Sequence, residues 1–148
     1  MDATRIHLFL NYIPVTATFL GMVLLLFGLW KRSGRIKRIS LGIFVLSALL
    51  VFTVYASGEI AGKGADLLVG PVWTNIGQHR SSALLAFAAI EVTGVLALTG
   101  LITLRRASEI ARWRIVALLI VSLTAAGLTA RTTYLGARIH SGDAAVTR

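Results

Sequence analysis

Three histidines are the side chains of this chain best suited to hold a metal ion or a haem iron: His7, His79 and His140. Imidazole is a common ligand of haem iron, copper and zinc. Each histidine alone is most simply an interfacial side chain bonded to backbone or to a lipid headgroup. If they converge, His7 and His79 are the expected axial ligands of a haem b. Asn11 lies one helical turn after His7, on the same face.

A second polar group belongs to the last apolar stretch of the chain. Arg131, Tyr134 and Arg138 recur at spacings of three and four residues, so they share one face of a helix. Arg131 or Arg138 would neutralise a haem propionate, or both would anchor in the lipid headgroups. Arg131 is also a candidate partner of Glu59. Glu59 joins the three histidines as a candidate metal ligand.

Glu91 is an ionisable residue deep inside an apolar stretch, about 13 Å from its start at about 1.5 Å per residue. An intramembrane carboxyl is a functional candidate by default, as a proton-carrying or cation-binding group of a transporter. The structural alternative is a neutral carboxyl bonded to a neighbouring hydroxyl or facing a partner subunit. Thr16 and Thr18 lie at a similar depth and are candidate partners.

Common catalytic patterns are missing from the sequence. It has no glycine-rich phosphate loop, no His-Glu-x-x-His motif, no paired carboxylates and no recognisable Ser-His-Asp set. It also has no cysteine, which excludes thiolate metal sites and thioether attachment of haem. We therefore expect no catalytic residues and no enzymatic activity of its own.

Membrane-spanning helices are the elements that must position these residues. The chain has 148 residues, of which 56% are hydrophobic and 14% charged, whereas soluble domains have about 45–50% and roughly 25%. Four apolar stretches reach the roughly 20 residues that a transmembrane helix needs: about 8–30, 39–57, 82–104 and 115–134. We expect a single all-α domain of four transmembrane helices over residues 1–148, with an outer loop at 58–81. Four glycines are expected to let these helices approach closely: Gly21, Gly28, Gly94 and Gly100.

The positive charges indicate how the chain lies in the membrane. Of the fifteen Lys and Arg residues, five lie at positions 31–38 and four at positions 105–114, the connections between the paired stretches. Because cytoplasmic loops collect cations, both connections are expected inside and both termini outside. Few cations precede the first apolar stretch, so we expect no cleaved signal peptide. The net charge of +9 therefore indicates topology in a lipid bilayer and not a nucleic-acid partner.

Short motifs spread over nearly the whole chain resemble a known group of proteins. They are Ile-His-Leu-Phe-Leu-Asn-Tyr-Ile-Pro at 6–14, Tyr-Ala-Ser-Gly-Glu at 55–59, His79, and Ala-Arg-Thr-Thr-Tyr-Leu-Gly-Ala-Arg-Ile-His at 130–140. They resemble small four-helix bacterial inner-membrane proteins of unknown function. The resemblance implies an outward-facing polar cluster: His7, Asn11, Glu59, His79, Arg131, Tyr134 and His140. Tyr12 and Arg80 stand where that group often has His and Glu, which removes two potential metal ligands and leaves a haem less affected.

Two functional hypotheses follow. The first is a small membrane subunit associated with a bacterial electron-transfer complex of the inner membrane, holding haem b or a metal ion at the histidines. The second is a purely structural accessory subunit of a larger membrane complex, without a cofactor of its own. Both predict other membrane protein subunits as partners.

Overall fold

The protein consists of four long α-helices. A computed structural model describes the backbone of residues 3–62, 71–106 and 109–146, and the side chains of residues 12–56, 77–106 and 109–136. The helices are α1 (Ala3–Trp30), α2 (Gly34–Gly62), α3 (Pro71–Arg106) and α4 (Arg112–Val146), and these described ranges contain no strand. Each helix has a segment long and apolar enough to cross a membrane: Tyr12–Trp30, Gly34–Ala56, Gly77–Arg106 and Arg112–Gly136. The predicted all-α architecture with four such helices is confirmed.

The helices extend beyond the apolar stretches that reveal them. α2 continues to Gly62 and α3 already begins at Pro71, so the predicted loop over 58–81 is wrong at both of its ends. α4 likewise continues to Val146. An apolar stretch marks only the hydrocarbon crossing, whereas a helix satisfies its own backbone and continues into polar surroundings. Pro71 suits the first helical position because its missing N–H has no partner there anyway.

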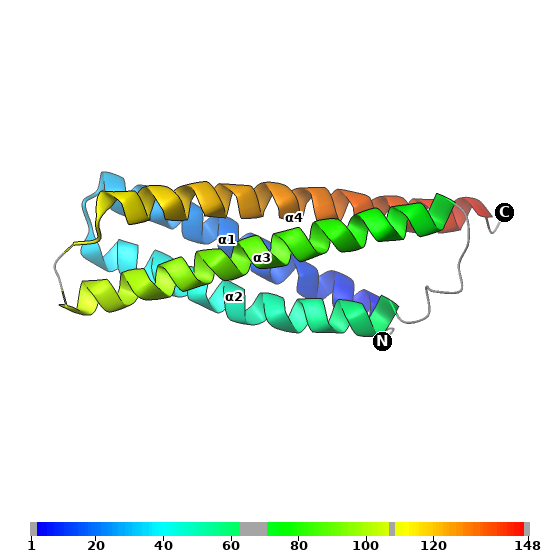
Figure 1. The fold of residues 1–148 in the computed structure, drawn as a ribbon, viewed down its shortest axis with the longest axis horizontal. Helices are drawn as coiled ribbons and strands as arrows, with labels where there is room; N and C mark the ends of the chain where they lie inside the picture. Colours follow the sequence, from blue (N-terminus) through cyan, green and yellow to red (C-terminus); the bar gives the residue numbers. More distant parts are fainter. Residues whose placement is uncertain (1–2, 63–70, 107–108, 147–148) are drawn as a thin grey trace.

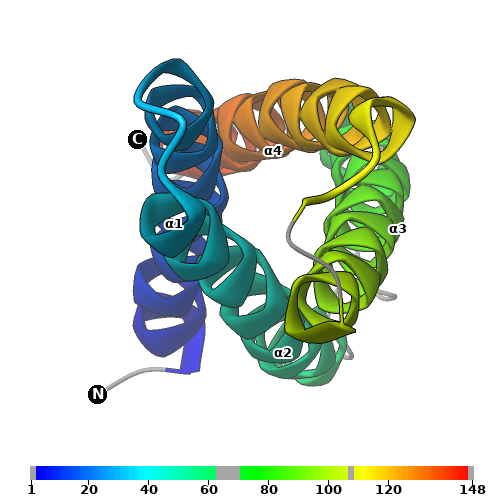
Figure 2. The ribbon, with the colours of Figure 1, turned by 90° about the vertical axis from the view of Figure 1, so that its left-hand side faces the viewer.

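The helices run antiparallel in a four-membered bundle (Figure 1). The α1–α2 and α3–α4 connections lie at one end, and α1 begins and α4 ends at the other. Around the bundle each helix has two neighbours, in the order α1, α2, α3, α4 (Figure 2). The α1–α4 contact is the sparsest of the four, and the two hairpins diverge toward the end where the chain begins and ends. The predicted hairpin pairs are thus confirmed, while the orientation in the membrane stays a prediction.

A tight corner joins α1 to α2. The backbone N–H of Ser33 donates to Gly28 O at 2.9 Å and that of Arg32 donates to Leu29 O at 3.1 Å. This pair of bonds is a Schellman motif, and Arg32 occupies its left-handed position with φ 50°. The Ser33 hydroxyl then accepts from the N–H of Ile36 at 3.4 Å and caps the start of α2. Only Lys31 and Arg32 therefore separate the last residue of α1, Trp30, from Ser33, the capping residue of α2.

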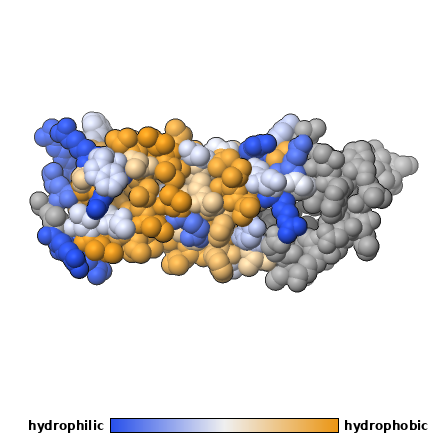
Figure 3. Space-filling model, viewed as in Figure 1, coloured by the Kyte–Doolittle hydropathy of each residue, from blue (hydrophilic) through white to orange (hydrophobic). Residues whose placement is uncertain are grey.

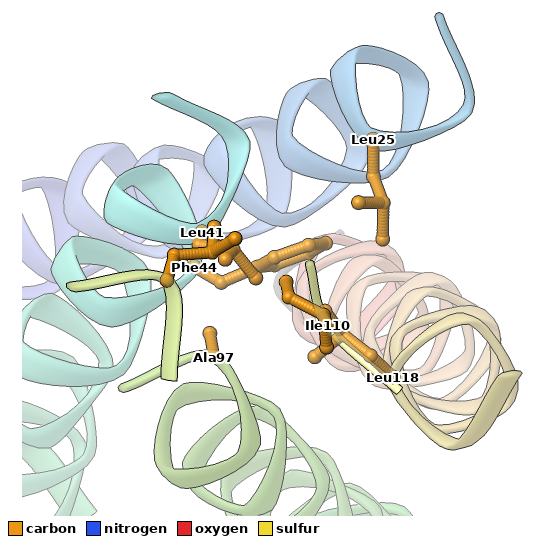
Figure 4. Close-up of a cluster of buried hydrophobic side chains, with 7 residues drawn as sticks. Leu25, Leu41, Phe44, Ala97, Ile110 and Leu118 are labelled. Atoms are coloured by element: carbon orange, nitrogen blue, oxygen red, sulfur yellow. The ribbon is translucent and has the colours of Figure 1, made fainter. Parts of the chain in front are cut away.

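The apolar core is densest near the two connections. A cluster from all four helices and the α3–α4 connection packs there (Figure 4): Leu25, Leu41, Phe44, Ala97, Leu104, Ile110 and Leu118. A smaller cluster follows toward the middle of the bundle: Ala48, Val51, Ile90 and Ala125. Exposed large apolar side chains occur on all four helices. On the face that Figure 3 shows they form an apolar band, and hydrophilic side chains gather at the end that carries the connections. A band of this kind is expected of a protein whose surroundings are lipid.

Two of the four glycines predicted to let helices approach closely, Gly94 and Gly28, leave no room for a side chain against the neighbouring helix. A Cβ atom at Gly94 would collide with the Cβ of Ala48 on α2. A Cβ at Gly28 would lie 3.0 Å from the backbone nitrogen of Lys37. Gly94 therefore belongs to the α2–α3 contact and Gly28 to the α1–α2 contact.

Candidate functional site

His79 is held against α4 by a hydrogen bond to the backbone. Its side chain is half-buried, and Nδ1 lies 3.0 Å from the carbonyl oxygen of Thr132. A carbonyl oxygen only accepts, so Nδ1 carries the hydrogen and donates it. Nε2 is then the nitrogen with a lone pair. A metal-ligating histidine is usually oriented in this way, with its other ring nitrogen bonded to a carbonyl or carboxylate.

Two neighbouring features of the sequence make room for this imidazole and brace it. A Cβ atom at Gly136 would lie only 3.2 Å from Cε1 of His79, so the ring occupies space that the absence of a side chain leaves. The hydroxyls of Thr132 and Ser82 are 2.9 Å apart, and both side chains are buried. Because Ser82 lies three residues after His79, and Gly136 four residues after Thr132, each pair shares one helix face. The α3–α4 contact therefore determines the orientation of the ring.

The predicted polar face of α4 lies apart from the His79 contact. Arg131 and Tyr134 are both exposed, with Tyr134 63% accessible. Thr132, which lies between these two residues in the sequence, is buried. The carbonyl group that accepts from His79 therefore lies on the buried side of α4. Arg131, the predicted partner of a haem propionate, lies on its exposed side. The side chain of Arg138 lies outside the described residues.

Most of the predicted histidine cluster lies beyond the side chains that the structure describes: His7, Asn11, Glu59 and His140. Their backbone positions fall near the start of α1, the end of α2 and the end of α4, which lie at the same end of the bundle as the start of α3 (Figure 1). Among the described side chains, no three His, Cys, Asp or Glu residues form a group that could hold a metal ion. The metal set and the convergence of the histidines stay predictions.

Glu91 lies on the side of α3 that adjoins α2. Phe87, one turn earlier, packs on Tyr55 of α2 with ring centroids 4.9 Å apart. Gly94, three residues later, packs on Ala48 of the same helix. The Glu91 side chain is half-buried. Within the part of the chain whose side chains are described, no residue forms a hydrogen bond or ion pair with it.

The predicted pairing of Glu91 with a threonine of the first helix is wrong. Thr18 Oγ1 instead lies 2.8 Å from Ser47 Oγ of α2, and Ser47 donates to the carbonyl of Pro14 at 2.9 Å. Thr16 donates to a carbonyl of its own helix, one turn earlier. Residues of α1 and α3 at the same depth in the membrane are not neighbours, because these two helices lie diagonally opposite in the bundle (Figure 2).

Apart from Thr18, the buried hydroxyls were not singled out in the sequence. They occur on all four helices: Thr18, Ser40, Ser47, Ser82, Thr93, Ser122, Thr129 and Thr132. Throughout the described part of the chain, every buried side-chain nitrogen and oxygen has a hydrogen-bond partner. Their signal in the sequence was Ser and Thr within the apolar stretches. In lipid such hydroxyls bond across helices or to their own backbone.

Comparison with known proteins adds no relative. No family model, curated protein or solved structure matches the chain. The resemblance of its short motifs to the bacterial four-helix group stays a prediction.

Proposed function

We propose that the protein is a small subunit of a bacterial inner-membrane electron-transfer complex, without catalytic activity of its own, and that His79 serves it as a ligand for haem b or a metal ion. The observation that carries the proposal is the bond from His79 Nδ1 to the Thr132 carbonyl. It selects the tautomer whose Nε2 has a free lone pair, and it orients the ring before any ligand arrives.

Several residues of the chain would contribute to binding the haem. His79 and His7 are the proposed axial ligands, and Arg131 or Arg138 would balance the charge of a propionate. Gly136 and Thr132 position His79 from α4. A bound haem would supply one-electron redox chemistry.

A purely structural accessory subunit is the second candidate. It is favoured by the polar interior, in which each described buried polar atom is already bonded within the protein. In this case the bond from His79 to Thr132 joins α3 to α4 and has no further role.

Absorption spectra of the purified full chain distinguish the two candidates. Protein from a haem-replete host is recorded oxidised and dithionite-reduced, beside His79→Ala and His7→Ala, with metal analysis of each sample. Electron transfer through haem predicts a Soret band that shifts on reduction and is lost in either variant. Colourless, metal-free and folded protein would reject the cofactor and leave the structural candidate.

A substitution behind the histidine separates a ligand from a structural contact. Gly136→Ala displaces the imidazole by a few tenths of an ångström, because its Cβ would lie 3.2 Å from the ring. If His79 is a ligand, this variant changes the reduced spectrum or the redox potential. Gly127→Ala is the matched control on the same helix, since a Cβ there meets nothing within 4 Å. Equal spectra for both variants would argue against ligation by His79.

A further inference from the structure

The end of the bundle that carries the two short connections is strongly basic. Nine cations lie there: Lys31, Arg32, Arg35, Lys37, Arg38, Arg105, Arg106, Arg112 and Arg114. Glu109 is the one carboxylate in the same segments, so the local net charge is nine minus one, or +8. Because both connections are at the same end (Figure 1), these charges form one surface, which we call the basic end.

Two of these cations hold helices together. Arg38 Nη2 donates to the carbonyl of Leu104 at 3.2 Å, which satisfies a carbonyl in the last turn of α3 from a side chain of α2. Arg114 Nη1 lies 2.5 Å from the hydroxyl of Thr103 and joins α4 to α3. Most of the others are exposed. The basic end thus has a fixed framework and a set of solvent-facing cations.

Tryptophans lie beside the cations at the edge of the apolar band. Trp30 ends α1 and is 74% exposed, and Trp113 begins α4 and is 64% exposed. Lys31 Nζ lies 4.3 Å from the ring centroid of Trp30, and Arg114 Cζ lies 5.3 Å from that of Trp113. Exposed tryptophan beside a cation at the border of an apolar band is the arrangement that suits a lipid headgroup region.

The corner between α1 and α2 keeps a cation where the backbone favours glycine. Arg32 occupies the left-handed position of the corner, with φ 50°. Glycine adopts this conformation with less strain than any other residue. The residue present therefore costs stability but adds a positive charge at the tip of the first hairpin.

We propose that the basic end binds the phosphate groups of anionic phospholipids in the leaflet that it contacts. Guanidinium groups suit phosphate because they donate two parallel hydrogen bonds. A lipid is favoured over an acidic protein because the exposed tryptophans flank the cations at the side of the bundle. The α1–α2 connection is also only three residues long, which leaves little surface standing clear of the membrane. This binding does not depend on the proposed electron-transfer role.

Spin-labelled lipids test the proposal on the full chain in phosphatidylcholine bilayers. The fraction of motionally restricted label gives the association of phosphatidylglycerol relative to phosphatidylcholine. We expect roughly fivefold preference for phosphatidylglycerol at low salt, the gain expected from one well-placed cation. The preference should approach one in about 1 M salt, because screening removes it.

Three substitutions at exposed cations provide the variant and its control. Arg32→Gln, Arg35→Gln and Arg105→Gln together should abolish most of the preference, whereas Lys at the same three positions should retain it. Arg32→Gly alone should lower the preference while raising the thermal stability, so a folding defect cannot explain its result. An equal association of the two lipids with the parent, or an unchanged preference in the Gln variant, overturns the proposal. Binding of a polyglutamate peptide without lipid preference would also overturn it, in favour of an acidic protein partner.

Discussion

Replacing Gly94 by alanine tests how closely α2 and α3 pack. The added methyl would collide with the Cβ of Ala48, which belongs to the buried cluster in the middle of the bundle. Methyl carbons normally stay about 3.5–4.0 Å apart. Both atoms are fixed to helix backbones, so no side-chain rotation relieves the collision, and the two helices must separate.

The expected loss of stability combines two opposing effects. Overpacking of a close contact costs about 1–3 kcal/mol, while alanine is more favourable than glycine inside a helix by about 1 kcal/mol. We therefore expect Gly94→Ala to lower the free energy of unfolding by about 0–2 kcal/mol relative to the parent, and by about 1–3 kcal/mol relative to a glycine whose added methyl meets no neighbour. Unfolding by a denaturing detergent in mixed micelles, followed by helical circular dichroism, measures this difference.

Matched glycines and a rescue variant make the measurement specific. Gly42→Ala and Gly127→Ala place the same methyl where nothing lies within 4 Å, and both should leave stability unchanged or raise it by up to about 1 kcal/mol. Adding Ala48→Gly to Gly94→Ala moves the methyl from one helix to the other and should restore most of the loss. If Gly94→Ala is as stable as the two controls, the close α2–α3 contact is refuted.

Two further substitutions probe the polar contacts between helices. Ser47→Ala removes the bonds to Thr18 and to the carbonyl of Pro14, and should lower the unfolding free energy by about 0.5–1.5 kcal/mol; an unchanged unfolding midpoint would contradict this. Arg38→Gln removes the donor to Leu104 O, and should speed hydrogen exchange in the last turn of α3 with little effect in the bundle centre. If the amides of this last turn exchange at the same rate in the parent and in the variant, the bond does not stabilise the end of α3.

The sequence by itself determined the number of helices, their pairing into two hairpins, and that both short connections lie at the same end of the bundle. About 20 apolar residues are needed to cross a bilayer, so the length of each stretch is sufficient to count the helices. Two helices joined by a short connection must pack as antiparallel neighbours. The α1–α2 and α3–α4 hairpins were therefore predictable. The helix ends were not, because a helix continues past the apolar stretch, as α3 does from Pro71.

Only the tertiary structure decided which polar side chains meet. Thr18 and Glu91 lie at similar depth, yet Thr18 bonds to Ser47 because α1 adjoins α2 and stands diagonal to α3. His79 was recognised as a candidate from its type, but its donor to the Thr132 carbonyl depends on the rotation of α3 against α4. Periodicity places a residue at a depth and on a face, whereas the order and rotation of helices are set by the packing of all four.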